Sequence, residues 1–177
     1  MKLLPCSLVA LLLATATPAL ANDLSGVWIF QKETNATPAG EEVQVPGPAY
    51  EGVLIYTPDG YVSANLMPKD RSWNVDTAKA EELRSSFEGS STGYAGRYEV
   101  DVEAGTVVHI PSVSLDPADT GRKLVRSYTL DKDTLKLSGH WQYQGRDLVF
   151  TVFWIRADNA PQTTAVDTRK APGDVGQ

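Results

Sequence analysis

The sequence predicts an all-β protein, an eight-stranded antiparallel up-and-down barrel with one amphipathic helix before the fourth strand. Three observations lead to this fold class. Short apolar or alternating segments recur between residues 24 and 156, tight turns join most of them, and one segment alone has helical periodicity. Short connections favour antiparallel neighbours, and eight such strands can close into a barrel without exposed edges. A two-sheet sandwich is the rival fold, but sandwiches favour longer crossover connections.

Residues 1–21 have the features of a secretory signal peptide rather than of a folded element. A basic start and an apolar stretch lead to Ala19-Leu20-Ala21, a small-residue cleavage site. The apolar stretch is shorter than the ~20 residues of a transmembrane helix. We therefore expect cleavage after Ala21 and a periplasmic or extracellular protein without a transmembrane segment. Cleavage would also remove Cys6, the one cysteine of the chain, and with it any disulfide.

The first strands are expected over residues 24–31, 52–57 and 61–67. Pro58-Asp59-Gly60 joins the last two as a hairpin, because proline presets φ and glycine accepts the left-handed conformation. Residues 32–49 are rich in proline, which removes the donors that a sheet needs. We therefore expect a long loop there.

The one helical pattern lies over residues 76–88. Ala80, Leu83 and Phe87 fall at helical spacing with charged residues between them, and Asp76 is suited to cap the start. This pattern predicts an amphipathic helix that packs its apolar stripe against the barrel.

The remaining strands complete the barrel, and we expect them over residues 92–101, 106–114, 122–130, 134–141 and 147–156. Pro111 predicts a bend, bulge or edge in the first half of this series. Residues 157–177 are polar and are expected to form a flexible tail. The predicted organisation is therefore a signal over residues 1–21, one barrel domain over residues 22–156, and the tail.

The overall composition excludes several classes of protein. A net charge of −6 and a pI near 4.9 argue against a nucleic-acid partner, which needs a basic surface. An apolar fraction of 42% is too high for a disordered chain. We therefore expect a folded domain without a nucleic-acid partner.

Several motifs in order resemble the bacterial and fungal lipocalin-like domain family, a group of calycin-type barrels. They are Leu24-Ser25-Gly26-Val27-Trp28 with its G-x-W pattern, Tyr56-Thr57-Pro58-Asp59-Gly60-Tyr61, Gly93-Tyr94-Ala95-Gly96-Arg97-Tyr98, His109, Arg126-Ser127-Tyr128-Thr129-Leu130 and Asp133-Thr134-Leu135-Lys136-Leu137. The resemblance implies an eight-stranded barrel with a helix before the fourth strand. It also implies that Trp28 plugs one end of the barrel and that Arg156 packs on it. Related barrels bind small hydrophobic molecules, and a few act as cyclases, isomerases or dehydratases.

Metal and phosphate chemistry has no support in the motifs. The chain has two histidines and no H-x-H or H-E-x-x-H spacing. It has neither a glycine-rich phosphate loop nor a G-x-S-x-G elbow. We therefore expect no metal and no cofactor.

His109 is the candidate for acid–base catalysis. It lies mid-strand, and Val107 and Val113 share its face. If that face points inward, the imidazole is suited to proton transfer near working pH. We favour the structural interpretation, a hydrogen-bonded or exposed histidine. His140 is expected to be exposed, because it lies opposite an apolar face.

Arg126 is a more specific candidate for ligand binding than His109. It alternates with Leu124 and Tyr128, and if those side chains line the interior, Arg126 enters with them. A buried guanidinium is costly unless a carboxylate or a ligand anion pairs with it. Our hypothesis is that Arg126 and His109 face one cavity and bind the polar end of an otherwise apolar ligand. An outward Arg126 or an internal salt bridge is the structural alternative.

The remaining ligand-binding candidates are aromatic residues that fall on strands. They are Tyr94, Tyr98, Tyr128, Trp141 and Trp154, with Phe150 beside them. Inward aromatic residues often serve core packing alone. Three functions therefore stay open: a carrier of a small, largely apolar molecule, a cofactor-free cyclase, isomerase or dehydratase that uses His109 or a tyrosine, and an envelope barrel with a filled interior.

Overall fold

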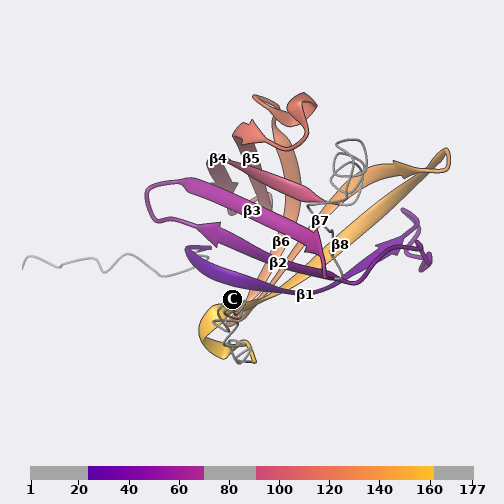
Figure 1. Ribbon diagram of the computed structural model, residues 1–177, viewed down its shortest axis with the longest axis horizontal. Coiled ribbons are helices and arrows are strands. Elements are labelled where there is room, and N and C mark those ends of the chain that lie inside the picture. Colours follow the sequence, from indigo (N-terminus) through magenta and orange to yellow (C-terminus); the bar gives the residue numbers. More distant parts are fainter. Residues whose placement is uncertain (1–23, 70–90, 162–177) are drawn as a thin grey trace, which may run out of the picture.

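The computed structural model describes residues 24–69 and 91–161 as one closed antiparallel barrel (Figure 1). Each strand pairs with the next along the chain, and the eighth pairs back with the first. The strands are β1 (Gly26–Ala36), β2 (Tyr50–Tyr56), β3 (Tyr61–Pro68), β4 (Thr92–Asp101), β5 (Thr106–Ser114), β6 (Leu124–Asp131), β7 (Thr134–Tyr143) and β8 (Arg146–Arg156). The predicted up-and-down barrel is confirmed.

The helices of the described ranges are two short 3-10 turns, η1 (Pro117–Asp119) and η2 (Ala157–Asn159). The amphipathic helix expected over residues 76–88 lies outside the described residues, and so do the signal over residues 1–21 and most of the predicted tail. Within the described ranges, no helix has the length and hydrophobicity to cross a membrane.

The β1 strand is longer than the sequence indicated. We expected it to end at Gln31 and the loop to begin at residue 32, but β1 continues to Ala36. Its second half pairs with β8 from Lys32 opposite Phe153 to Ala36 opposite Val149, after a register shift beyond Phe30. The first proline of that stretch comes only after Ala36, so every residue up to there can donate to the ladder. The loop prediction over residues 32–36 was wrong for this reason.

One turn and one bulge follow the glycine and proline signals. Gly60 has φ +88° in the turn that joins β2 to β3, as the hairpin prediction requires. The β4–β5 register shifts between Ala95 and Gly96, opposite Pro111, so the predicted irregularity is a bulge. A Cβ at Gly96 would lie 2.0 Å from the carbonyl oxygen of Ile110, and only glycine allows this approach.

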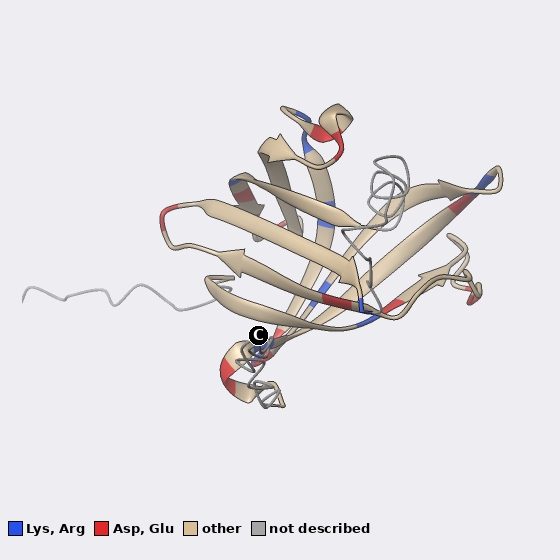
Figure 2. Cartoon of the chain, in the orientation of Figure 1, with Lys and Arg blue, Asp and Glu red and all other residues tan. Residues whose placement is uncertain are grey.

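The core fills the interior toward the end of the barrel where β1 begins. Side chains of alternate residues point inward, and the buried set includes Trp28, Leu54, Tyr56, Val62, Val107 and Leu135. Each fully buried aliphatic or aromatic side chain of this kind stabilises the fold by roughly 1.5–3 kcal/mol. Charged residues lie elsewhere: Figure 2 shows acidic residues in the β2–β3 turn and in the segment after β8, with basic residues spread along several strands.

Trp28 and Arg156 close that end together, as the resemblance implied. The indole nitrogen of Trp28 donates to the carbonyl of Leu24 at 2.9 Å, and the Arg156 guanidinium lies 4.3 Å from the indole centroid. Nη1 of Arg156 donates to the Ser25 carbonyl at 2.9 Å. Gly26 has φ +132°, and a Cβ there would lie 2.8 Å from Nη1 of Arg156. The glycine of the G-x-W pattern is therefore required by the arginine that covers the tryptophan.

Candidate functional site

A cavity of about 1230 Å³ occupies the barrel at the end opposite Trp28. Its lining comes from all eight strands, mainly from the second half of β1 and β3 and the first half of β2, β4 and β6, together with the loops beside them. Pockets for small ligands usually measure roughly 300–1,000 Å³. This one is large enough for a ligand of that class.

The wall of the cavity combines aromatic and aliphatic side chains with polar and charged ones, Lys32 and Lys69 among them. Phe30, Leu54, Phe150, Val152 and Trp154 contribute to it, and Phe30 meets Trp154 edge to face with centroids 5.8 Å apart. Trp141 also lines the cavity, and its indole nitrogen donates to the side-chain oxygen of Asn35 at 2.9 Å. The aromatic and aliphatic part of this wall favours an apolar ligand body.

His109 lies inside the barrel with 1% of its surface exposed. Nε2 is 2.6 Å from the Tyr56 hydroxyl, and Nδ1 is 2.6 Å from the Tyr94 hydroxyl. Burial and, second, the charge of Arg126 lower the pKa of His109 to about 3. Burial raises the pKa of Tyr94 to about 12 and that of Tyr56 well above 10. All three groups are therefore neutral near pH 7, and His109 is the hydrogen-bonded histidine that we favoured.

The face assignment of β5 needs one correction. Val107 is fully buried beside His109, but Val113, which we placed on the same face, is 63% exposed. The bulge between Pro111 and Val113 shifts the alternation by one residue, which turns every later side chain to the other face. His140 is exposed as expected, with its imidazole 3.3 Å from Asp147.

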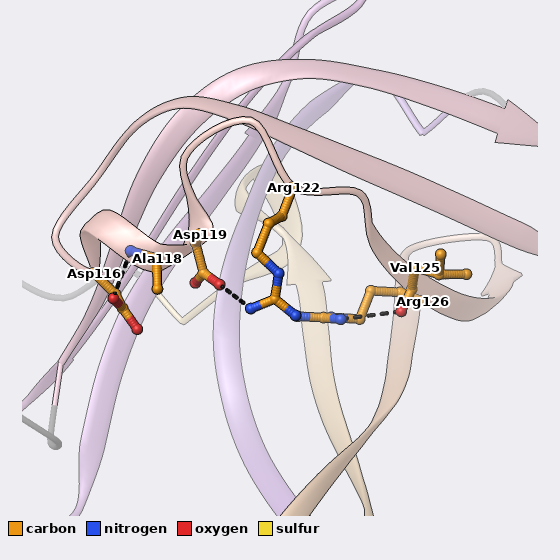
Figure 3. A network of polar contacts seen from close by, with 6 residues as sticks. All are labelled: Asp116, Ala118, Asp119, Arg122, Val125 and Arg126. Carbon is orange, nitrogen blue, oxygen red and sulfur yellow. Dashed lines mark hydrogen bonds and ion pairs between the residues drawn. The ribbon is translucent and has the colours of Figure 1, made fainter.

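Arg126 lines the same cavity as His109, so of the two orientations that the sequence left open its side chain has the inward one. It pairs with Val107 across the β5–β6 ladder, two residues from the pairing of His109 with Leu124. Its guanidinium lies 5.1 Å from the Phe150 ring centroid, and Nη1 donates to the Val125 carbonyl at 3.0 Å (Figure 3). Within residues 24–69 and 91–161 no carboxylate forms an ion pair with it. The internal salt bridge that we considered is therefore absent from the described chain.

The carboxylates of Glu33, Asp116 and Asp119 also line the cavity. Asp119 lies in η1, and its charge raises the pKa of Tyr94 whereas that of Arg126 lowers it. Its carboxylate is 3.3 Å from Nη1 of Arg122, which is 65% exposed (Figure 3). Asp119 therefore has a cation of its own at the cavity mouth.

The other predicted site residues divide into two groups. Tyr94, Trp141 and Trp154 line the cavity beside His109 and Arg126. Tyr98 and Tyr128 do not line it: Tyr98 packs on Tyr56 and donates to the Thr57 carbonyl at 3.1 Å. The Tyr128 hydroxyl is buried and has no hydrogen-bond partner in the described chain.

Tyr56 is the residue of this site that sequence reasoning missed. We used it only as the start of the β2–β3 hairpin motif. The signal was available, since Leu54 and Tyr56 alternate on β2 and both are buried. Its partner His109 is 53 positions away in the sequence, and no local pattern reports such a contact. Among the described residues, no group of three or more histidine, cysteine or acidic side chains is placed to bind a metal ion.

Comparison with known proteins adds one positive finding. A family model described as a lipocalin-like domain matches residues 25–157, from the start of β1 to the beginning of η2. No curated protein matches the chain.

Proposed function

We propose that this protein, which belongs to the lipocalin-like domain family, binds a small, largely apolar molecule inside its barrel. The ligand body would lie against the aromatic wall, and its polar group would lie at Arg126 and Tyr94. One observation carries this proposal: the cavity of about 1230 Å³ combines an apolar wall with a cation that has no carboxylate partner in the described chain.

Arg126 supplies the polar selectivity of the proposed site. Arg126 is half-buried at the cavity. Its neighbours are a ring and a neutral carbonyl, so the described chain supplies no counter-charge for its guanidinium. An anionic ligand group would complete it with charge-assisted hydrogen bonds, each worth roughly 1.5–3 kcal/mol. This corresponds to about tenfold to a hundredfold in affinity.

The alternatives that the sequence left open have less support. A general base must be free to take a proton near working pH, but both nitrogens of His109 are engaged and its pKa is lowered to about 3. A structural barrel with a filled interior does not fit a cavity of this size. We further propose that the protein acts outside the cytoplasm, because residues 1–21 have the pattern of an export signal.

The test is a fluorescence titration of the exported, processed chain with N-phenyl-1-naphthylamine, a neutral probe that brightens in apolar surroundings. Dodecanoate then displaces the probe. Arg126→Ala should weaken dodecanoate binding by about tenfold or more and leave probe affinity within about twofold. Arg97→Ala is the matched control, because Arg97 also has its guanidinium over an aromatic ring, that of Tyr61, but is exposed and does not line the cavity, and it should change neither.

Two results would contradict the proposal in different ways. Absence of saturable probe binding would remove the ligand-binding function. Unchanged dodecanoate affinity in Arg126→Ala would remove the role of this arginine alone. Native mass spectrometry of protein from its source would then show whether a ligand co-purifies and what it is.

A further inference from the structure

We propose that Tyr56, His109 and Tyr94 form a hydrogen-bonded chain with one fixed direction, which presents the Tyr94 hydroxyl hydrogen to the cavity beside Arg126. Tyr56 donates to Nε2 of His109, Nδ1–H of His109 donates to Tyr94, and Tyr94 donates to the ligand. The ligand group that fits is an oxygen acceptor, above all an anionic oxygen. This inference rests on the proposed function, because it specifies the chemistry of the molecule held at the same site.

The first step concerns the number of hydrogens available. A neutral imidazole carries one N–H and one bare nitrogen. Both nitrogens of His109 lie 2.6 Å from a tyrosine hydroxyl. One tyrosine must therefore donate to His109, and the other must accept from it. The accepting tyrosine keeps its own hydrogen for a third partner.

The second step decides which tyrosine donates. Tyr56 is 1% exposed, does not line the cavity, and its hydroxyl has His109 as its hydrogen-bond partner in the described chain. If Tyr56 accepted from His109, its own hydrogen would be buried without an acceptor, which is costlier than any other arrangement of the chain. Tyr56 therefore donates to Nε2, and the hydrogen of His109 is on Nδ1.

The third step follows the hydrogen of Tyr94. Its hydroxyl accepts from Nδ1–H, and the described chain offers it no other hydrogen-bond partner. Tyr94 lines the cavity, so the open direction for its hydrogen is the ligand or a water in its place. Hydrogen bonds in series polarise one another, which makes the last donor of such a chain stronger than a lone hydroxyl.

Arg126 adds a positive charge to the Tyr94 donor. The charge of Arg126 acts on both Tyr94 and His109, and a guanidinium has donors only. Two donors and a positive charge thus converge on one part of the cavity. A carboxylate or an enolate-like oxygen satisfies both donors, a ketone satisfies them without the charge, and an ammonium group is repelled. Asp119, the nearby acid, is already paired with Arg122.

The direction of the chain can be measured without any ligand. A long-range ¹H–¹⁵N spectrum of the histidine ring shows which nitrogen carries the hydrogen. Recorded on His140→Gln, it reports His109 alone, since the chain has two histidines. We expect a neutral ring with the hydrogen on Nδ1 and a bare Nε2. A hydrogen on Nε2, or on both nitrogens, at pH 7 would overturn the inference.

The ligand class is tested by displacing N-phenyl-1-naphthylamine with dodecanoate, 2-dodecanone and dodecylamine. We expect affinity to fall in that order. Tyr94→Phe should weaken dodecanoate and 2-dodecanone by about tenfold, with probe affinity unchanged. Tyr98→Phe is the control, because its hydroxyl bonds a backbone carbonyl away from the cavity lining.

The outcomes separate this inference from the proposed function. Dodecylamine binding as tightly as dodecanoate, or an unchanged acid affinity in Tyr94→Phe, would overturn the acceptor class while ligand binding stands. If Tyr94→Phe does not fold, Tyr56→Phe replaces it: His109 then loses its fixed hydrogen position, and the preference for dodecanoate over dodecylamine should shrink. Failure of the probe to bind at all would overturn the proposed function, and the ring spectrum would still decide the direction of the chain.

Discussion

Acid should destabilise this barrel through His109. Burial and the charge of Arg126 lower the pKa of this histidine to about 3, whereas an unfolded histidine titrates near ~6.5. Below that pH the unfolded chain gains a proton that the folded chain refuses. Stability therefore decreases with acid: the contribution of His109 is fully present above about pH 6.5 and is lost as the pH falls toward about 3.

The magnitude follows from the size of the shift. A difference of one pKa unit corresponds to ~1.36 kcal/mol, so a value of about 3 implies a total loss on the order of 5 kcal/mol across the window. Stability should fall by roughly 1.4 kcal/mol per pH unit below about pH 6. Domains are stable by about 5–15 kcal/mol, so this one buried ring decides much of the acid tolerance.

The assay is urea unfolding at several pH values between about 7 and about 4.5, where most carboxylates are still ionised. The parent is compared with His109→Gln, whose amide can accept from Tyr56 and donate to Tyr94 without titrating. We expect His109→Gln to be less stable at pH 7 and to have a much flatter pH dependence. His140→Gln, which removes a side chain that is 67% exposed, should follow the parent. A parent whose stability is flat from pH 7 to 5, or a His109→Gln with the parent's slope, would refute the reasoning.

Two further predictions concern stability at pH 7, measured by urea unfolding. Tyr128→Phe removes a buried hydroxyl that has no partner in the described chain, so it should leave stability unchanged or raise it by up to ~1 kcal/mol. Tyr98→Phe loses a hydrogen bond of 3.1 Å and should lower stability by ~1 kcal/mol. A Tyr98→Phe variant more stable than Tyr128→Phe would contradict the assigned contacts. Gly26→Ala introduces a side chain at φ +132° that would lie 2.8 Å from Nη1 of Arg156 and should cost ~1–3 kcal/mol. Gly145→Ala, also at positive φ but with open space around it, should cost less, and equal losses would mean that the Arg156 contact is unimportant.

The barrel could be predicted because the sequence patterns that indicate its strands and turns are local. Alternation, hairpin turns and short connections each involve a few adjacent residues, and the β4 and β5 boundaries match the prediction. The errors arose where pairing overrides local composition. The second half of β1 is polar in part, yet it forms a strand because β8 needs a partner over that length. Val113 is exposed because a bulge in β5 shifts the alternation, and the position of that bulge depends on the partner strand β4.

The candidate site could be predicted only in outline. Alternation on β6 placed Arg126 inside, and His109 came inside beside it on the neighbouring strand. The hydrogen bond from Tyr56 could not be foreseen, because it joins strands that are not neighbours in the barrel. Nor does alternation reveal how far down the barrel a residue lies, which is why Tyr98 and Tyr128 entered the predicted site but pack outside the cavity lining.

Two arginines of the barrel, Arg156 and Arg126, differ in how their charges are balanced. Arg156 covers Trp28, donates to a carbonyl of the chain start, and lies 3.8 Å from the carboxylate of Asp133. Its charge is balanced within the protein, as a structural role requires. Arg126 has an aromatic ring and a carbonyl but no carboxylate in the described chain, and it faces a cavity. The fold supplies a carboxylate to Arg156 and none from the described chain to Arg126, which supports our proposal that the anion for Arg126 comes from a ligand.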